Sequence, residues 1–416
     1  MTVCVHGLGY IGLPTAAVLA NAGERVLGYD ASQSVRESLK NGTVHVDEPG
    51  LTGLVKREVE TGNLEVVTEP ESADVHVVCV PTPFDEDRKE PDLSYVEQCG
   101  ETIAEILRPG DTVVLESTVP PGTTTDVFRP LLESSGLVAG EDFGLAHCPE
   151  TVLPGNILTE LKRNDRVIGG VDAASCDVAI ALYETFVDGD LRTTDATTAE
   201  FVKLIQNTFR DTNIAFANEV AKIAAEHGID SRTAIELANE HPRVGILNPG
   251  PGVGGHCLPV DPWFLVQSST TSELIETARQ VNHSMIDYVI DELDQRVDGL
   301  AGRQIAVLGV AYKGDVDDAR RSPGLDLSQK LQQRTDGRID VRLHDPHVVD
   351  QVLDLQPLER ALDGADATVI VTDHSDFAEL RPTEVAEQMA GTLVFDTRAM
   401  LDAPKWESAG LEIVRI

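Results

Sequence analysis

One Gly/Pro-rich loop combines residue types that can carry covalent chemistry. The segment Asn248–Trp263 reads NPGPGVGGHCLPVDPW, and it holds Cys257 with an acid, Asp261, four residues later. Glycine permits positive φ and lets a ligand approach the backbone closely. A cysteine thiolate is a nucleophile, although most cysteines are simply buried. The loop therefore fits either a nucleophile at a ligand site or a structural cysteine beside a tight turn.

A second glycine-rich turn lies near the N-terminus. The strand pattern Thr2–His6 is followed by G-x-G-x-x-G and a helical pattern, Leu13–Ala22; a further strand, Val26–Tyr29, ends at an acid. This arrangement is typical of dinucleotide binding, with the pyrophosphate at the helix N-terminus. The acid would accept from ribose hydroxyls and repel a 2′-phosphate, so the pattern predicts NAD rather than NADP. The candidate cofactor contacts are Gly7, Gly9, Tyr10, Ile11, Gly12 and Asp30.

More candidate residues follow the next predicted strands, Asp74–Val80, Thr112–Glu116 and Gly144–His147. These strands complete a doubly wound parallel sheet, and such sheets bind ligands at the carboxyl ends of their strands. A carboxylate at that edge is a candidate general base, but it could equally be a solvated loop acid. The hydroxyl side chains there could also merely cap a turn. The residues at the strand ends are Pro81, Thr82, Ser117, Thr118 and Glu150.

The middle of the chain predicts helices. Thr197–His227 reads as one long helix that ends at Gly228, and 31 residues at ~1.5 Å each span about 46 Å. Lys203 and Asn207 are four residues apart and therefore share a face of this helix. Its apolar stripe predicts contact with a partner subunit. Shorter helices over Ser231–Glu240 and around Ser272–Gln295 would complete a dimer core.

A new α/β pattern begins at Gly302, and it lacks a second G-x-G-x-x-G. A second dinucleotide is therefore not expected, but a related nucleotide could use the strand ends. Ser322-Pro323 is typical of a helix start. The predicted strands are Gln304–Gly309, Val341–Leu343, Ala367–Val371 and Thr392–Phe395. Basic residues after these strands are candidate phosphate contacts, with solvated surface charges as the alternative: Lys313, Arg320, Arg321 and Arg398.

Composition restricts the partners. The 416 residues carry 70 acidic and 33 basic side chains, a net charge of −37, which opposes binding to nucleic acid or anionic membranes. We interpret the acidity as adaptation to high salt, with an ordinary acidic cytosolic protein as the alternative. The six cysteines show no CxxC and no zinc spacing, so neither a metal nor disulfides are expected. No signal peptide or membrane span is apparent, so the sequence predicts a cytoplasmic protein.

These pieces suggest a chemistry beyond simple alcohol oxidation. A thiolate that adds to an aldehyde gives a thiohemiacetal, which can lose a second hydride to become a thioester; hydrolysis then gives an acid. The sequence must supply a group that stabilises the oxyanion and a base that activates water. Lys203, Asn207, Asp261 and Glu150 are the right residue types.

At these residues the sequence resembles, from end to end, the UDP-glucose/GDP-mannose dehydrogenase family of nucleotide-sugar 6-dehydrogenases. The family motif G-G-x-C-x-P-x-D stands at Gly254–Asp261, its Lys/Asn helix motif at Lys203 and Asn207, and its S-T-V-P-P-G turn at Ser117–Gly122. The resemblance implies two Rossmann-like doubly wound parallel-sheet domains joined by a central all-helical dimerisation domain with one long helix. The expected domains are NAD-binding (1–195), helical dimerisation (196–298) and UDP-sugar-binding (299–416).

The resemblance also implies two successive oxidations of C6 with two NAD⁺ and one water, and no metal. Carried over by position, Cys257 is the nucleophile, and Lys203 and Asn207 stabilise the oxyanion. Asp261 assists Lys203 and the water, and Glu150 is the base for thioester hydrolysis.

Four further roles follow from the same resemblance. Thr118 orients the hydrolytic water. Arg320 looks like the arginine that reaches back to the cofactor, and Arg398 looks like a contact on the substrate side. Arg243 resembles the arginine donated across a homodimer to the sugar nucleotide.

Three segments, 152–170, 207–219 and 241–264, resemble the branch that oxidises UDP-N-acetyl-D-mannosamine to UDP-N-acetyl-D-mannosaminuronate. One departure is Thr151, where that branch usually has arginine, so UDP-N-acetylglucosamine and UDP-glucose stay open as substrates. A two-electron β-hydroxyacid dehydrogenase and a non-catalytic nucleotide-sugar or NAD sensor are the competing functions. The expected substrate contacts are Glu150, Val152, Lys203, Asn207, Arg210, Asn213, Arg243, Gly254, Lys313 and Arg398.

Overall fold

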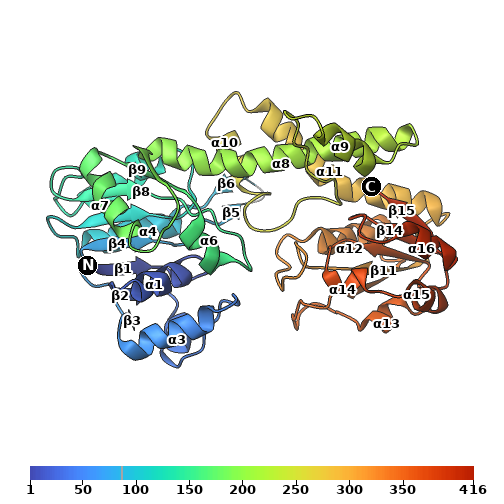
Figure 1. The fold of residues 1–416 in the computed structure, drawn as a ribbon, viewed down its shortest axis with the longest axis horizontal. Helices are drawn as coiled ribbons and strands as arrows, with labels where there is room; N and C mark the ends of the chain where they lie inside the picture. The colour runs from blue at the N-terminus through green and yellow to red at the C-terminus, as the bar shows by residue number, and fades with distance from the viewer. Residues whose placement is uncertain (86–87) are drawn as a thin grey trace. The chain divides into compact units, whose positions relative to one another are not determined.

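The computed structural model describes residues 1–85 and 88–416. The chain divides into two compact units (Figure 1). The first comprises Met1–Gln206 and Trp263–Thr270, and the second comprises Asn207–Pro262 and Thr271–Ile416. Each unit contains a β-sheet with helices on both faces.

The sheet of the first unit has eight strands in the order β10-β9-β8-β7-β4-β1-β2-β3. The strands from β8 to β3 are parallel, whereas β9 runs antiparallel to β8 and β10 runs parallel to β9. Central strands such as β1 and β4 are apolar and almost wholly buried, as expected where helices cover both faces. The bounds are β1 Thr2–His6, β2 Arg25–Tyr29, β3 Leu64–Val66, β4 Val75–Val78, β7 Thr112–Leu115, β8 Gly144–His147, β9 Arg166–Gly170 and β10 Leu191–Asp195.

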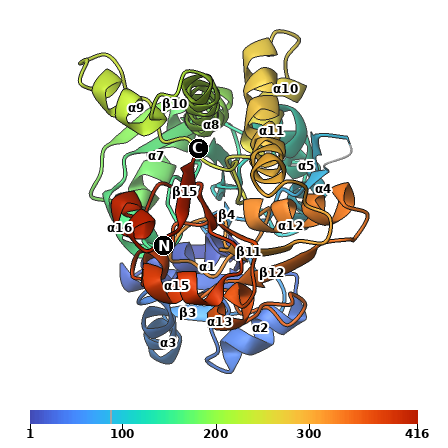
Figure 2. The same ribbon diagram turned by 90° about the vertical axis from the view of Figure 1, so that its right-hand side faces the viewer.

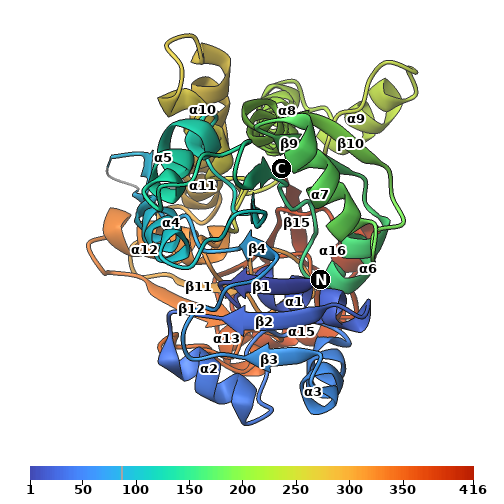
Figure 3. The same cartoon turned by 90° about the vertical axis from the view of Figure 1, so that its left-hand side faces the viewer.

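Two groups of helices cover this sheet (Figure 3). One face packs against α1 (Gly12–Asn21), α3 (Leu51–Thr61), α6 (Ile157–Arg163) and α7 (Ala173–Tyr183). The other face packs against α4 (Ser94–Ala104), the π-helical turn η1 (Thr123–Phe128) and α5 (Arg129–Glu133). The unit also holds α2 (Gln33–Lys40) and the small hairpin β5 (Phe84–Asp85) and β6 (Glu90–Pro91).

The second unit has a five-stranded parallel sheet in the order β12-β11-β13-β14-β15. Helices α11 (Glu273–Arg296) and α12 (Pro323–Arg334) cover one face; α13 (Leu358–Leu362), α14 (Ser375–Ala378), α15 (Pro382–Gln388) and α16 (Ala403–Ser408) cover the other (Figure 2). The strands are β11 Gln304–Leu308, β12 Asp340–His344, β13 Ala367–Ile370, β14 Leu393–Asp396 and β15 Glu412–Arg415.

Helix α8 (Ala196–Glu226) has 31 residues and contributes to both units, and α9 (Ser231–Asn239) follows it. Inside the second unit, Asp211 of α8 is wholly buried and accepts from Arg279 and from Asn282 of α11. Asn282 also accepts from Asn218 of α8 over 2.9 Å. This polar network fixes the register of the two helices, because each buried group needs its partner.

The structure confirms the predicted fold class, including the long helix and the helix start at Ser322, whose side chain accepts from the backbone of Gly324 and Leu325. The first sheet is not parallel throughout: β9 and β10 were not predicted, and they reverse direction. Neither strand has a clear apolar pattern: β9 reads RVIGG and ends in two glycines, and β10 reads LRTTD with no fully buried residue, so the periodic signal is weak. The three-domain division stays a prediction.

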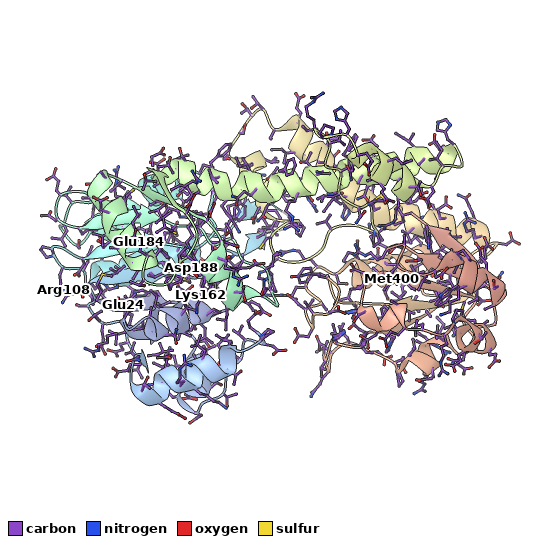
Figure 4. The ribbon with its side chains drawn as sticks, in the orientation of Figure 1. Glu24, Arg108, Lys162, Glu184, Asp188 and Met400 are labelled. Carbon is purple, nitrogen blue, oxygen red and sulfur yellow. The ribbon has the colours of Figure 1, made fainter. Side chains whose placement is uncertain are left out.

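Figure 4 draws the side chains on both units; of the residues it labels, Glu184 and Asp188 are exposed. Within the described ranges, no helix is both long and apolar enough to span a membrane.

Candidate active site

In the first glycine turn, two positions have no room for a side chain, and at the third a side chain would point into open space. A Cβ on Gly7, which has φ +90°, would lie 2.7 Å from the carbonyl oxygen of Cys79, and a Cβ on Gly12 would lie 1.8 Å from that of Gly7. A Cβ on Gly9 would meet no heavy atom within 4 Å. The backbone at Gly9, at the N-terminus of the ten-residue α1, is therefore open to a pyrophosphate.

Asp30 lies at the end of β2, beside this turn. Its carboxylate accepts from the backbone N–H of Leu8 and of Ser32, each over 2.8 Å. Every carboxylate oxygen can accept more than one hydrogen bond, so Asp30 can still bind ribose hydroxyls. The open glycine and the anchored acid together fit NAD.

At the next strand ends, hydroxyl groups tie neighbouring segments together. The Ser117 hydroxyl donates to the carbonyl of Val80 over 2.7 Å, and the Thr82 hydroxyl donates to the carbonyl of Thr118 over 2.8 Å. These contacts match the turn-capping alternative for Ser117. The proposed contacts of Ser117, Thr118, Pro81 and Thr82 with NAD stay predictions, as do those of Tyr10 and Ile11.

Glu150 follows β8 and is a buried acid. Burial raises the pKa of Glu150 to about 7, while the positive charges of Lys203 and Arg166 oppose the rise. Its Oε1 is buried without a hydrogen-bond partner in the part of the chain that the structure describes. Lys203 is itself buried on α8 in the same unit. A carboxyl group that titrates near neutral pH suits a general base.

In the second unit, Asn207 and Asp261 come together with Cys257. Cys257 is exposed, whereas the other five cysteines are buried or half-buried. Its carbonyl oxygen accepts from the backbone N–H of Val260 (2.9 Å) and of Asp261 (2.8 Å), which begins the turn into α10 (Asp261–Gln267). The Asp261 side chain accepts from Nδ2 of Asn207 over 2.6 Å. The predicted nucleophile is therefore accessible, and the turn that bears it is joined to Asn207 through Asp261.

The double glycine before Cys257 is required by close backbone packing. A Cβ on Gly254 would lie 2.6 Å from the carbonyl oxygen of Arg321. Gly255 has φ +91°, and its N–H donates to the carbonyl of Arg320 over 3.2 Å. The Arg320 guanidinium pairs with Asp318 (2.6 Å) and contacts a ring nitrogen of His256 (2.6 Å). Its contact with the cofactor stays a prediction.

Other predicted substrate residues have varied surroundings. The Arg398 guanidinium donates to the carbonyl of Val371 over 2.7 Å, lies next to Gly250, and has a pKa lowered by burial. The Asn213 amide binds the backbone of Gly245 and Leu247, so it positions the loop after α9. Val152 packs partly on the core. Arg210, Arg243 and Lys313 are exposed.

Sequence reasoning missed two buried acids that hold predicted site segments. Glu200 of α8 accepts from the backbone of Gly122 and Thr124, just after Thr118, and burial raises its pKa to about 7. Glu48 accepts from the backbone of Gly155 and Ile157, and so holds the loop that follows Glu150. Each glutamate stands alone in the sequence, far from the segment that it binds, so no motif marks its role.

Comparisons with known proteins agree with this geometry. Three models of the UDP-glucose/GDP-mannose dehydrogenase family match in order: the NAD binding domain (residues 1–187), the central domain (197–284) and the UDP binding domain (306–403). A UDP-N-acetyl-D-mannosamine dehydrogenase of Methanocaldococcus jannaschii is 44% identical, with 99% of this chain and 95% of that protein covered.

Two further relatives extend the comparison. An NDP-N-acetyl-D-galactosaminuronic acid dehydrogenase of Ralstonia nicotianae is 44% identical, with 97% of each chain covered. The solved structure of a UDP-D-ManNAc dehydrogenase from Pyrococcus horikoshii superposes with a TM-score of 0.93 at 41% identity, covering 100% of this chain and 99% of that one. With its open glycine turn, its Cys257 loop and these matches along its length, this chain belongs to the UDP-glucose/GDP-mannose dehydrogenase family and is an NAD-dependent nucleotide-sugar dehydrogenase.

Proposed function

We propose that the protein oxidises the C6 hydroxymethyl group of UDP-N-acetyl-D-mannosamine to a carboxylate, through a covalent intermediate on Cys257. The full-length similarity to dehydrogenases named for this substrate supports it. UDP-N-acetylglucosamine and UDP-glucose are the alternative substrates, because Thr151 stands where the resemblance to that branch implies an arginine.

The proposed chemistry assigns one role to each residue. Bound NAD⁺ supplies a hydride acceptor for each of the two oxidations. The first oxidation removes a hydride from C6 and a proton from its hydroxyl, which is released to solvent, and leaves the C6 aldehyde. The Cys257 thiolate adds to this aldehyde to form a thiohemiacetal as its oxyanion, and loss of the second hydride from C6 leaves a thioester. Glu150 takes a proton from water, the hydroxide adds to the thioester carbonyl, and the C–S bond breaks to release the acid and the thiolate.

The oxyanion formed at C6 needs hydrogen-bond donors. Asn207 gives one amide N–H to Asp261, and the second remains for the oxyanion. Lys203 adds a positive charge, and Thr118 orients the attacking water. Asp261 holds Asn207 and assists Lys203.

The observation that carries the proposal is the exposed Cys257 thiol, whose turn is joined to Asn207 through Asp261. The test is the yield of NADH per UDP-sugar, at low and high salt, with UDP-N-acetylmannosamine, UDP-N-acetylglucosamine and UDP-glucose. We expect two NADH per sugar with the true substrate. Cys257→Ser should abolish turnover, whereas Gln267→Ala, an exposed position on α10, should not.

Other yields would contradict the proposal in specific ways. One NADH per sugar, with the aldehyde as product, would contradict the role of Cys257. Activity that survives truncation at about Gly299, with no need for Cys257, would indicate a β-hydroxyacid dehydrogenase. Binding of UDP-sugars without NADH formation would indicate a sensor.

We also infer a cytoplasmic homodimer. Three exposed apolar residues of α8 recur every seven positions, namely Phe209 (67% exposed), Phe216 (53%) and Ile223 (51%). A seven-residue repeat places side chains along one face of a helix, as in helix-to-helix packing. A second copy of α8 is the proposed partner.

A further inference from the structure

The unpredicted strand β9 brings a buried arginine to the ligand edge of the first sheet. Because β9 is antiparallel to β8, with Gly169 opposite His147, its first residue, Arg166, lies toward the carboxyl end of β8. Arg166 is only 3% exposed. Its guanidinium stacks over the rings of Tyr183 (4.8 Å) and Phe186 (5.6 Å).

Two strand ends meet at this guanidinium. Its Nη1 lies 3.4 Å from Oε1 of Glu116, directly after β7, and 3.9 Å from Sγ of Cys148, directly after β8. Glu116 precedes Ser117 and Thr118, and Cys148 lies two residues before Glu150. Arg166 therefore joins the strand ends that carry the proposed water-orienting threonine and the proposed base.

Both oxygens of the Glu116 carboxylate have hydrogen-bond partners. Tyr183 donates its hydroxyl to Oε1 over 2.7 Å, while the Cys79 thiol (3.1 Å) and the Thr15 hydroxyl (3.4 Å) contact Oε2. A buried ion pair costs desolvation that an apolar core would avoid, so it is weak evidence for stability. A role in positioning and charge explains why the ion pair lies here.

The charges that act on Glu150 come from four elements. Lys203 of α8 and Arg166 of β9 favour the ionised carboxylate, whereas Glu116, after β7, and Glu160 of α6 disfavour it. Removing Arg166 would leave Lys203 as the one favourable charge among these four. A nearby opposite charge typically moves a carboxyl pKa by about 1–3 units, and because Arg166 is the smaller of the two favourable contributions to Glu150, we expect its loss to raise the pKa by about one unit.

We propose that Arg166 is a positioning residue, which ties the ends of β7 and β8 together and holds the carboxylate of Glu150 ready to activate water. This inference rests on the proposed role of Glu150 in hydrolysis. Its first test is therefore independent of turnover.

The first test is thermal unfolding from pH 4 to 9 of matched pairs: wild type with Glu150→Gln, and Arg166→Met with Arg166→Met/Glu150→Gln. The pKa of Glu150 is raised from 4.5 to about 7, so its contribution to stability is fully present below pH 4.5 and is lost as the pH rises to 7. The difference in Tm, Glu150→Gln minus wild type, should therefore rise between pH 4.5 and pH 7 and level off above pH 7. Subtraction within each pair cancels Glu200, which titrates in the same range.

In the Arg166→Met pair, we expect this difference to level off about one pH unit higher. Arg166→Lys, which keeps the charge but loses the planar guanidinium that stacks on Tyr183 and Phe186, should give an intermediate curve. If the Tm difference of the Arg166→Met pair follows the same pH curve as that of the wild-type pair, the proposal is overturned. If Arg166→Met does not fold, a Lys curve displaced upward supports the proposal and a coincident one overturns it.

The second test follows the thioester by mass spectrometry of protein quenched in acid during turnover at pH 7. Arg166→Met should hydrolyse the thioester about fivefold more slowly, because a one-unit rise in the pKa lowers the ionised fraction of Glu150 at pH 7 by about that factor, and it should accumulate the adduct on Cys257, with Arg166→Lys between Met and wild type. The same variants at pH 9 should recover, because Glu150 is then ionised in all of them. Slow hydrolysis that persists at pH 9 would overturn the proposal in favour of a merely structural role. A wild type without turnover contradicts the proposed function but leaves the unfolding test intact.

Discussion

The amide of Asn207 donates to the carboxylate of Asp261 over 2.6 Å, which links helix α8 to the first turn of α10. Asp261 also donates its backbone N–H to the carbonyl of Cys257 over 2.8 Å. One residue therefore connects the proposed oxyanion donor to the turn that bears the proposed nucleophile. The position of the thiol depends on a helix 50 residues earlier in the sequence.

Asn207→Ala should lower kcat more than it raises KM. The substitution removes an N–H donor that the proposed mechanism uses mainly when charge develops at C6, and loss of one such donor costs roughly 10²–10³ in rate. Steady-state kinetics with saturating NAD⁺ would measure the effect. Gln206→Ala, its exposed neighbour on α8, is the control. Equal losses in both variants would contradict the assignment.

Gly9→Ala and Gly12→Ala should fail in different ways. A Cβ at position 12 would clash with the carbonyl oxygen of Gly7 at 1.8 Å, so Gly12→Ala should destabilise the first unit by several degrees in Tm. A Cβ at position 9 points into open space, so Gly9→Ala should fold normally and instead weaken NAD binding. Calorimetric titration with NAD⁺ and thermal unfolding separate the two outcomes. Tight NAD binding by Gly9→Ala would contradict the proposed pyrophosphate position.

Hydrolysis of the thioester should depend on pH with an apparent pKa near 7. Glu150 acts as a base only when ionised, and burial raises its pKa to about 7. The hydrolysis rate should therefore fall about tenfold per unit below pH 7 and level off above it. Rapid-quench kinetics would measure it, with Glu150→Gln removing both the activity and the pH dependence. A rate independent of pH between 5 and 8 would contradict the role of Glu150.

The sequence predicted those parts of the site whose chemistry lies in local motifs. The glycine turn with Asp30 and the loop around Cys257 are short and contiguous, so their residue types alone indicated a function. Arg166 was not predicted, because its role arises only when β9 reverses direction and brings it to Glu116. A buried arginine at the start of a short strand looks, in sequence, like a surface charge.

The same distinction applies to the acids. Asp261 was identified through its spacing from Cys257, whereas Glu200 and Glu48 hold backbone segments that are about 76 and 107 residues away. Their partners are backbone N–H groups, which have no sequence signature. Tertiary hydrogen bonds of this kind are visible only in the folded chain.

Salt should stabilise the protein. With a net charge of −37, exposed carboxylates repel one another, and the Debye length falls from about 10 Å at 0.1 M salt to 3 Å at 1 M. The Tm should therefore rise across this range of KCl. Sucrose at matched osmolality is the control, since it acts by exclusion and screens no charge. A Tm that rises equally in both would contradict adaptation by charge.

Charged residues on the exposed stripe of α8 should separate the proposed dimer. Phe209 is 67% exposed, and a large apolar side chain so exposed on a helix is typical of a surface that a partner covers. Phe209→Asp would put a carboxylate into the proposed interface and another opposite it, so the mass in solution should fall to about one chain's 44.8 kDa. Multi-angle light scattering after gel filtration would measure it, with Val349→Asp, which is 94% exposed in the loop after β12 and lies outside the helices predicted for the dimer, as the control. A wild type that already elutes as a single chain would contradict the dimer, and a Phe209→Asp variant that stays dimeric would place the interface on another surface.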